Sequence, residues 1–203
     1  MTSIRAVIFD LGGVLVRTED RAPRDRLAAR LGMTYDELSS LIFESPSSKQ
    51  ASLGQIGVSQ HLESVRANLG LSLEAFQAAY EEFWAGDALD IGLVDFLRSL
   101  RPRYQTALLS NAWDDLRGVL DREWNILDAF DQVIISAEVG LVKPDERIFR
   151  LALERLGVTP GEAVFVDDFT HNVEAARLAG LHAIHFRNAD QVRAEVEQLL
   201  GIR

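Results

Sequence analysis

The run Ala6-Val7-Ile8-Phe9-Asp10 is four apolar residues that stop at a carboxylate, and the architecture of the chain follows from it. Short runs rich in Val and Ile that are bounded by turns are typical of strands buried in a parallel sheet. Three further runs end in the same way: residues 106–109 before Ser110 and Asn111, residues 133–135 before the loop with Lys143, and residues 164–166 before Asp167 and Asp168. Ligands of open α/β sheets bind beyond the carboxyl ends of the strands. These polar side chains are therefore expected at one edge of one sheet.

The second half of the chain alternates between helix and strand. Helices are predicted at residues 93–100, 114–124, 144–156, 171–179 and 191–200, and strands at residues 106–109, 132–135, 163–166 and 183–186. Pro144 is expected in the first turn of its helix. Strands that alternate with helices imply a parallel sheet with right-handed crossovers, so the fold class is predicted to be α/β.

A segment of different texture separates the first strand from the others. From about residue 20 to residue 85 only helical periods are found, such as the apolar stripe from Val58 to Leu69. Thr34 and Glu37 predict a capping box, whereas residues 45–48 predict a loop. We expect four short helices here, inserted as a domain of residues 17–92 into a core of residues 1–16 and 93–203.

Composition narrows the classes of function. The chain has 203 residues, of which 47% are hydrophobic and 26% charged, and its net charge is −10. So acidic a chain repels nucleic acid and anionic membranes, and neither is expected as a partner. The lack of cysteine excludes disulfides, thiolate catalysis and cysteine-bound zinc. The N-terminus lacks a secretory pattern and no run reaches the ~20 apolar residues of a membrane span. A cytoplasmic location is expected, with a monomer and a homodimer both open.

Three acids carry the strongest chemical signal. Asp10 ends a buried strand, where a carboxylate is costly unless something holds it; alone, it equally fits a cap for the Gly12-Gly13 turn. Asp167 and Asp168 at a second strand end repel each other and Asp10. Mg²⁺ takes oxygen ligands and removes that repulsion. The alternative for the pair is an N-cap on the following helix, and one acid can cap while the other binds metal.

Ser110, Asn111 and Lys143 suit a phosphate group. A hydroxyl, an amide and backbone N–H groups near a helix start fit phosphate oxygens, with ordinary turn chemistry as the alternative. Lys143 can neutralise charge on a transferring phosphoryl group, with a solvated surface position as the alternative. Trp113, just after the Ser-Asn pair, is expected to pack in the core.

Four motifs together resemble those of the haloacid dehalogenase (HAD) superfamily of hydrolases. They are AVIFDLGGVLV at residues 6–16, TALLSNAW at 106–113, EVGLVKPDERIF at 138–149 and VFVDDFTHNVEAARLAG at 164–180. They occur in the family's order, and the resemblance covers nearly the whole chain. It implies a Rossmann-like core with an inserted helical cap, and a phosphatase that acts on a small phosphorylated metabolite.

The resemblance also implies roles for the residues that transfer the phosphoryl group. Asp10 would be the nucleophile that attacks phosphorus and forms an aspartyl-phosphate, which water then hydrolyses. Ser110 and Asn111 would hold the phosphoryl oxygens. Lys143 would stabilise the nucleophile and the phosphate together.

The metal ligands follow by the same resemblance. Mg²⁺ would be bound by Asp10, by the backbone carbonyl of Gly12 and by Asp168, while Asp167 would act through water or by hydrogen bonding. Asn172 would orient Asp168 or a water. The metal would screen carboxylate from phosphate and fix an in-line approach.

Gly12 departs from the family's pattern. Phosphatases of this family usually carry a second Asp there, as a general acid/base, and such help typically contributes ~10²–10⁴ in rate. Three explanations are open: a substrate with a good leaving group, such as an anomeric or acyl phosphate; a proton donor from the cap or its linker, for which Glu19 and Asp20 are the nearest candidates; or slow catalysis.

Three functions are compared on these residues. A Mg²⁺-dependent phosphomonoesterase agrees with all the motifs. A metal-independent dehalogenase, in which Asp10 displaces halide from carbon, is disfavoured because Asp167 and Asp168 would repel an anionic haloacid. A non-catalytic binding or regulatory module is disfavoured by the intact Asp10, Lys143 and Asp168 and favoured by Gly12. Fold alone does not choose among them.

Overall fold

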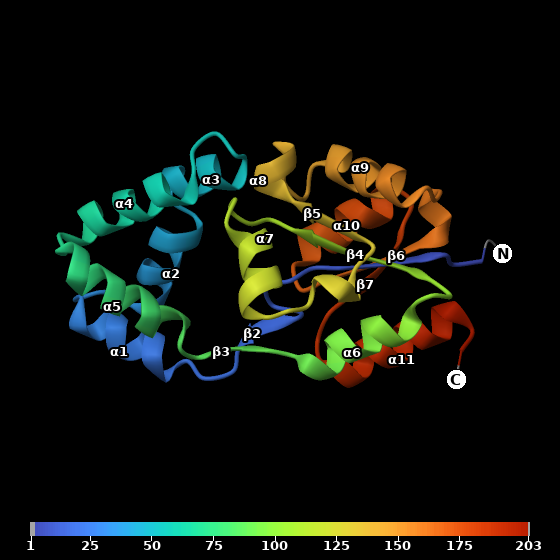
Figure 1. Ribbon diagram of the computed structural model, residues 1–203, viewed down its shortest axis with the longest axis horizontal. Helices are drawn as coiled ribbons and strands as arrows, with labels where there is room; N and C mark the ends of the chain where they lie inside the picture. The colour runs from blue at the N-terminus through green and yellow to red at the C-terminus, as the bar shows by residue number, and fades with distance from the viewer. Residues whose placement is uncertain (1–2, 203) are drawn as a thin grey trace.

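A five-stranded parallel sheet forms the centre of the computed structural model, which describes residues 3–202 (Figure 1). The sheet order is β5-β4-β1-β6-β7, so the first strand of the chain lies in the middle. The strands are β1 (Ala6–Phe9), β4 (Gln105–Ser110), β5 (Gln132–Ile135), β6 (Ala163–Asp167) and β7 (His182–His185). This arrangement confirms the predicted α/β fold.

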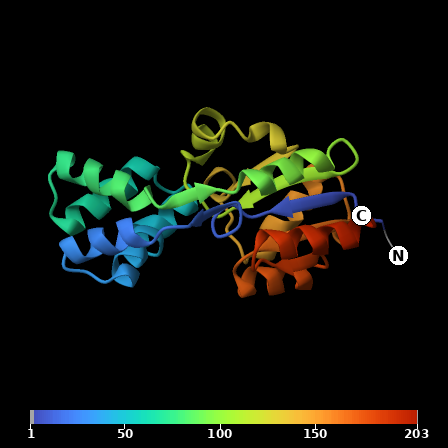
Figure 2. The same ribbon diagram turned by 90° about the horizontal axis from the view of Figure 1, so that it is seen from below.

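Helices cover both faces of the sheet (Figures 1 and 2). The core contains α6 (Ile91–Leu100), α7 (Leu116–Gly118), α8 (Ser136–Val139), α9 (Glu146–Leu156), α10 (Thr170–Leu178) and α11 (Ala189–Leu200). A π-helical turn (Val119–Glu123) and two 3₁₀ turns (Leu127–Ala129 and Pro160–Glu162) complete it.

Alternate side chains of β1 are buried on opposite faces of the sheet. Val7 and Phe9 pack in the cluster that includes residues of α6 and α11, whereas Ala6 and Ile8 pack in the cluster that includes residues of α9 and α10. Because both faces are covered, the strand is apolar at every position instead of alternating.

Five helices with a hydrophobic cluster of their own lie beside the core and form the cap (Figure 1). They are α1 (Ala22–Arg30), α2 (Tyr35–Phe43), α3 (Pro46–Ser52), α4 (Val58–Leu69) and α5 (Leu73–Trp84). The capping box of Thr34 and Glu37 is present at the start of α2. The predicted loop at residues 45–48 is wrong, and with it the count of four helices. Ser45 instead caps α3, accepting a hydrogen bond from the Ser48 N–H at 3.3 Å, and Pro46 occupies the first turn.

Two short antiparallel strands join the cap to the core. β2 (Val16–Thr18) pairs with β3 (Asp87–Leu89). Buried Arg24 of α1 binds both carboxylate oxygens of Asp87, at 2.8 and 2.9 Å. The sequence did not predict this ribbon, because strands of three residues carry too little periodicity.

Each predicted core helix begins one or two residues from the predicted position, and one of them is divided. The helix expected from Pro144 begins at Glu146, because the Asp145 side chain accepts the Arg147 N–H at 2.9 Å and acts as the N-cap. The helix expected at residues 114–124 is divided into α7 and the π-helical turn. Within residues 3–202, the helices are all too short or too polar to cross a lipid bilayer.

Candidate active site

Three carboxylates meet where β1 and β6 end. The two strands are neighbours in register, with Phe9 opposite Val166, so the residues that follow them emerge at the same edge of the sheet. Asp10, Asp167 and Asp168 each place one carboxylate oxygen within 4.8 Å of the others. The structure thus brings together residues separated by more than 150 positions in the chain.

Lys143 lies between two of these acids. Its Nζ is 2.8 Å from Asp10 Oδ1 and 2.7 Å from Asp167 Oδ2. The side chain is almost completely buried, which is not the position of a solvated surface lysine. The ammonium therefore compensates part of the negative charge that the sheet edge collects.

Asp167 is saturated with hydrogen-bond donors. Lys143 donates to Oδ2 and the Phe169 N–H donates to Oδ1 at 2.8 Å. Asn172 Nδ2 is 3.1 Å from both oxygens. Of the two expected partners of Asn172, Asp168 or a water, Asp168 is not contacted: from the first turn of α10 the Asn172 amide nitrogen donates to Asp167 instead.

Asp168 is held differently. Its Oδ1 is buried without a hydrogen-bond partner in the part of the chain that the structure describes. Its carboxylate covers Gly13, where a Cβ would overlap it. Its backbone carbonyl accepts a hydrogen bond of 2.8 Å from His185 Nε2. A buried carboxylate oxygen with no donor, beside two further carboxylates, is a donor set that fits a hard cation such as Mg²⁺.

The pKa values of two of these acids, Asp10 and Asp168, are raised. Burial is the main reason that the pKa of Asp10 rises to about 7; the Asp167 charge raises it further, and Lys143 opposes the shift. Burial, and then Asp167, also raise the pKa of Asp168. Burial away from water is thus the larger cause of both shifts, and the charge of Asp167 adds to it.

The residues after β4 lie close to Lys143. Ser110 is the last residue of β4 and is buried. The Asn111 side chain donates from Nδ2 to the Lys143 carbonyl at 2.9 Å, and its Oδ1 accepts the Lys143 N–H at 2.8 Å. The amide therefore ties the two loops together.

Neighbouring candidates have other contacts. Glu19 pairs with Arg17 at 2.9 Å, and Asp20 accepts the Ala22 N–H at 2.9 Å at the start of α1. Trp113 packs in the hydrophobic cluster of the cap, not in that of the sheet.

Sequence reasoning missed His185, because its contact with the Asp168 carbonyl depends on the pairing of β6 with β7.

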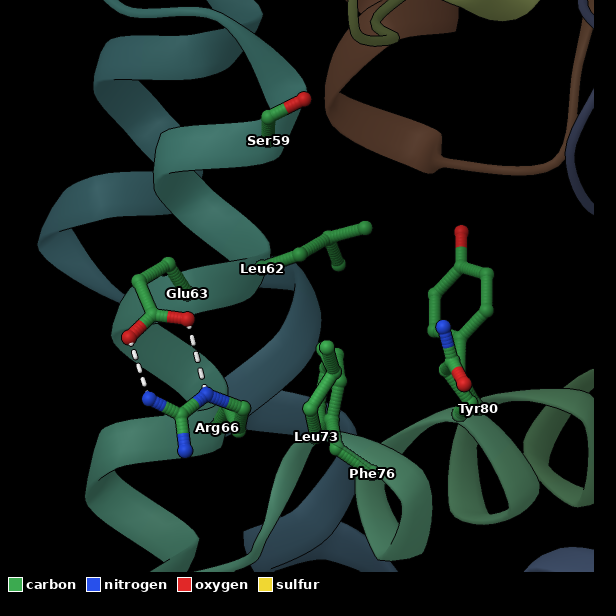
Figure 3. Close-up of a pocket in the computed structure, with 8 residues that line it drawn as sticks. Ser59, Leu62, Glu63, Arg66, Leu73, Phe76 and Tyr80 are labelled. Carbon is green, nitrogen blue, oxygen red and sulfur yellow. Dashed lines mark hydrogen bonds and ion pairs between the residues drawn. The ribbon is translucent and has the colours of Figure 1, made fainter.

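A separate hollow of about 240 Å³ lies in the cap between α4 and α5 (Figure 3). Leu62, Phe76 and Tyr80 line it. None of the predicted site residues does. The acid cluster at the sheet edge, and not this hollow, is the candidate active site.

The parallel sheet, the helical cap and the acid cluster define the class of capped α/β hydrolases. The chain belongs to the haloacid dehalogenase-like hydrolase family, whose model matches residues 4–180.

Related proteins include phosphatases. The chain is 26% identical to the sesquiterpene phosphatase astK of Aspergillus oryzae, over 98% of each protein. It is 28% identical to bifunctional epoxide hydrolase 2 of Rattus norvegicus over 98% of this chain, but spans only 39% of that longer protein. The HAD family enzyme bt-2542 of Bacteroides thetaiotaomicron was solved as an aspartate-to-alanine mutant with magnesium and inorganic phosphate. It superposes with a TM-score of 0.73 at 26% identity, over 91% of this chain and 95% of that chain.

Gly13→Ala is expected to displace Asp168. The new Cβ overlaps its carboxylate, and the backbone φ of 75° disfavours any side chain, at a cost of about 1–3 kcal/mol. Calorimetry should show lower thermal stability and weaker Mg²⁺ binding. Gly12→Ala is the matched control, because no atom lies within 4 Å of a Cβ at that position. Equal effects in the two variants would contradict the close approach of Asp168 to Gly13.

Asp10 is expected to make the metal-free protein less stable as the pH rises. Its pKa of about 7 in the folded state exceeds the ordinary value of 3.8, so between these values the folded state binds more protons than the unfolded state, and the free energy of unfolding falls with increasing pH. Asp10→Asn removes this titration. In urea unfolding with a chelator present, the variant should gain stability relative to the wild type between about pH 4 and pH 7. A difference independent of pH would mean that the pKa of Asp10 is not raised.

Proposed function

We propose that this hydrolase is a Mg²⁺-dependent phosphomonoesterase that acts on a small phosphorylated metabolite through an aspartyl-phosphate at Asp10. The observation that carries the proposal is the arrangement of Asp10, Lys143 and Asp168: a carboxylate held by an ammonium at 2.8 Å, beside a second carboxylate with an oxygen that has no hydrogen-bond partner among residues 3–202.

Asp10 is prepared to act as the nucleophile. Its Oδ1 accepts a hydrogen bond from the Leu11 N–H at 2.7 Å and forms an ion pair with Lys143 at 2.8 Å, and these two contacts fix the direction of the carboxylate. A carboxylate oxygen attacks phosphorus, the bond from phosphorus to the ester oxygen breaks, and the alcohol leaves with a proton from solvent or a nearby acid. Water then attacks the aspartyl-phosphate, releases inorganic phosphate and restores Asp10.

The residues that would hold Mg²⁺ are Asp10, Asp168 and the carbonyl of Gly12. Bound there, the ion would screen the carboxylate from the phosphate and orient the phosphoryl group. Asp167 would take part indirectly, because Lys143, Asn172 and the Phe169 N–H already occupy both its oxygens. It would keep the ammonium of Lys143 in place.

The phosphate oxygens would be held by Ser110, by backbone N–H groups after β4 and by Lys143. The Asn111 side chain is engaged with the Lys143 backbone, so its contribution would be to position that lysine. The donors lie at the strand ends next to the nucleophile, where charge develops on the transferring group.

The relatives support a phosphatase over a dehalogenase. A sesquiterpene phosphatase is similar over nearly its whole length, and a similar structure holds magnesium and inorganic phosphate. In this chain, two acids crowd the nucleophile, and without a cation they would repel an anionic haloacid.

Asp10→Asn is expected to reduce hydrolysis of an aryl phosphate by roughly 10⁴-fold or more, because the amide is no nucleophile and such losses are typical when the attacking group is removed. The wild-type activity should stop when Mg²⁺ is chelated and return when Mg²⁺ is added back. Circular dichroism controls for folding of the variant. Wild-type turnover that persists under chelation would remove the metal from the proposal, and normal turnover by Asp10→Asn would remove the nucleophile.

Gly12 predicts a dependence on the leaving group. Because it has no proton to donate, activated phosphates such as acyl or aryl phosphates should turn over about 10²-fold or more faster than alkyl phosphates. Gly12→Asp, at a position with open space for a side chain, should narrow this gap. Equal wild-type rates for both classes would indicate that another residue supplies the proton.

A further inference from the structure

We infer that Trp113 and Asp114 are positioning residues: they seat the cap on the segment that follows Ser110 and Asn111, beside the segment that precedes Lys143, and so link the position of the cap to the phosphate-binding side of the site. The inference rests on the proposed function for its effect on turnover, but the seating itself is independent of it.

Trp113 follows strand β4 of the core in the sequence, but its side chain packs in the hydrophobic cluster of the cap. It is 8% exposed, and every other buried member of its cluster lies between Leu27 and Phe83. Its ring stacks on Phe43 of α2, with centroids 6.2 Å apart and planes at 19°. It also contacts His61 of α4, at 4.7 Å. The core thus contributes one large side chain to the interior of the cap.

Asp114 caps a helix of the cap from across the boundary. Its Oδ1 accepts the Val58 N–H at 2.9 Å, at the first residue of α4. Gly57 precedes this helix and has no side chain to offer, and a Cβ there would lie 3.3 Å from Asp114 Oδ2. A carboxylate at a helix N-terminus is favourable because it meets unpaired N–H groups and the positive end of the helix dipole.

A second contact adjoins the first. α3 lies beside α8 (Figure 1), and a Cβ at Gly54, just after α3, would overlap the carbonyl oxygen of Ala137 in α8. The preceding residue, Ser136, accepts the Ala112 N–H at 3.0 Å and donates to the Ala112 carbonyl at 3.1 Å. The cap therefore rests on residues 112–114 and 136–137 together.

Both segments lie near residues of the candidate phosphate site in the sequence. Ser110 and Asn111 immediately precede the first segment, and Lys143 follows the second. Asn111 and Lys143 are joined by two hydrogen bonds. The acids proposed to bind Mg²⁺ follow β1 and β6 and lie on neither segment. Loosening the cap should therefore affect turnover and leave Mg²⁺ affinity unchanged.

Two variants remove the Asp114–Val58 hydrogen bond from opposite sides. Asp114→Ala deletes the acceptor. Val58→Pro deletes the donor at the first helical position, where proline is well tolerated, and Gly57 already has the extended backbone (φ −75°, ψ 158°) that a following proline requires. Each should lower kcat for an aryl phosphate by up to about 30-fold, the factor that corresponds to the full free energy of a lost N-cap contact.

The double variant should be no slower than the slower single variant, because both substitutions remove one contact. Asp114→Asn, which keeps an acceptor oxygen, should restore most of kcat. Mg²⁺ affinity should stay within about two-fold of the wild type. Asp121→Ala, at an exposed acid downstream, controls for the loss of one negative charge and should behave as the wild type.

Amide hydrogen exchange tests the seating without reference to activity. In Asp114→Ala and in Val58→Pro, residues 54–57 and 112–114 should exchange faster while β1 and β6 keep their protection. Unchanged exchange in both variants would overturn the inference, as would losses in kcat that multiply in the double variant. A wild type inactive on every phosphate ester would refute the proposed function alone, and the exchange measurement would still decide the seating.

Discussion

The ion pairs of Lys143 are the interaction on which the site depends. Three carboxylates converge on one edge of a parallel sheet, and a buried charge is costly unless it is paired. The ammonium contacts Asp10 and Asp167 at 2.8 and 2.7 Å, which makes the cluster compatible with a folded core. One positive charge does not balance three negative ones, and the pKa of Asp10 stays raised in spite of Lys143, mainly because of burial and further because of the Asp167 charge. In the proposed function, Mg²⁺ would offset this excess of negative charge.

The residues of the candidate site lie at or after the ends of four strands. The ends of β1 and β6, which are neighbours in the sheet, carry the carboxylates, whereas Ser110 at the end of β4 carries the hydroxyl and the loops after β4 and β5 carry Asn111 and Lys143. Asn111 joins the loops after β4 and β5 through the backbone of Lys143. In the proposed mechanism, the nucleophile Asp10 depends on Lys143, whose backbone is held by the Asn111 amide from a different loop. Asp167 completes the arrangement by holding the ammonium from the other side.

The cap and the core are joined by more than a linker. The β2–β3 ribbon provides the covalent connection, and Arg24 ties α1 to it through Asp87. A second junction lies at the site itself, where Trp113 enters the cluster of the cap. The β2–β3 ribbon and, as we infer, the contacts of Trp113 and Asp114 hold the cap at two places. The inserted cap agrees with the family to which the chain belongs. The residues that we infer to seat it, Trp113 and Asp114, are identified from the structure of this chain.

The strands and their polar ends were predictable because their signal is local. A strand covered on both faces has to be apolar at every position, and Ala6 to Phe9 show this directly in the sequence. The capping box of Thr34 and Glu37 is local in the same sense. By contrast, the sequence Ser45-Pro46-Ser47-Ser48 fits a loop and a helix start equally well, and burial of Ser48 and Ala51 in the cap selects the helix. The helix predicted to start at Pro144 begins at Glu146 for a related reason, because the Asp145 side chain takes the capping position.

The order of polar residues along the chain was therefore enough to establish an α/β fold with an inserted helical segment, and to indicate which edge of the sheet carries the chemistry. The hydrogen-bond partners of these residues could not be predicted from their order in the sequence. Asn172 binds Asp167 and not Asp168, Asn111 holds the backbone of Lys143, and Asp114 caps a helix 56 residues earlier in the chain. Each of these contacts depends on the relative placement of two elements that pack independently of their spacing in sequence. Apolar periodicity is a property of a single segment, whereas a hydrogen bond between segments exists only once the chain has folded.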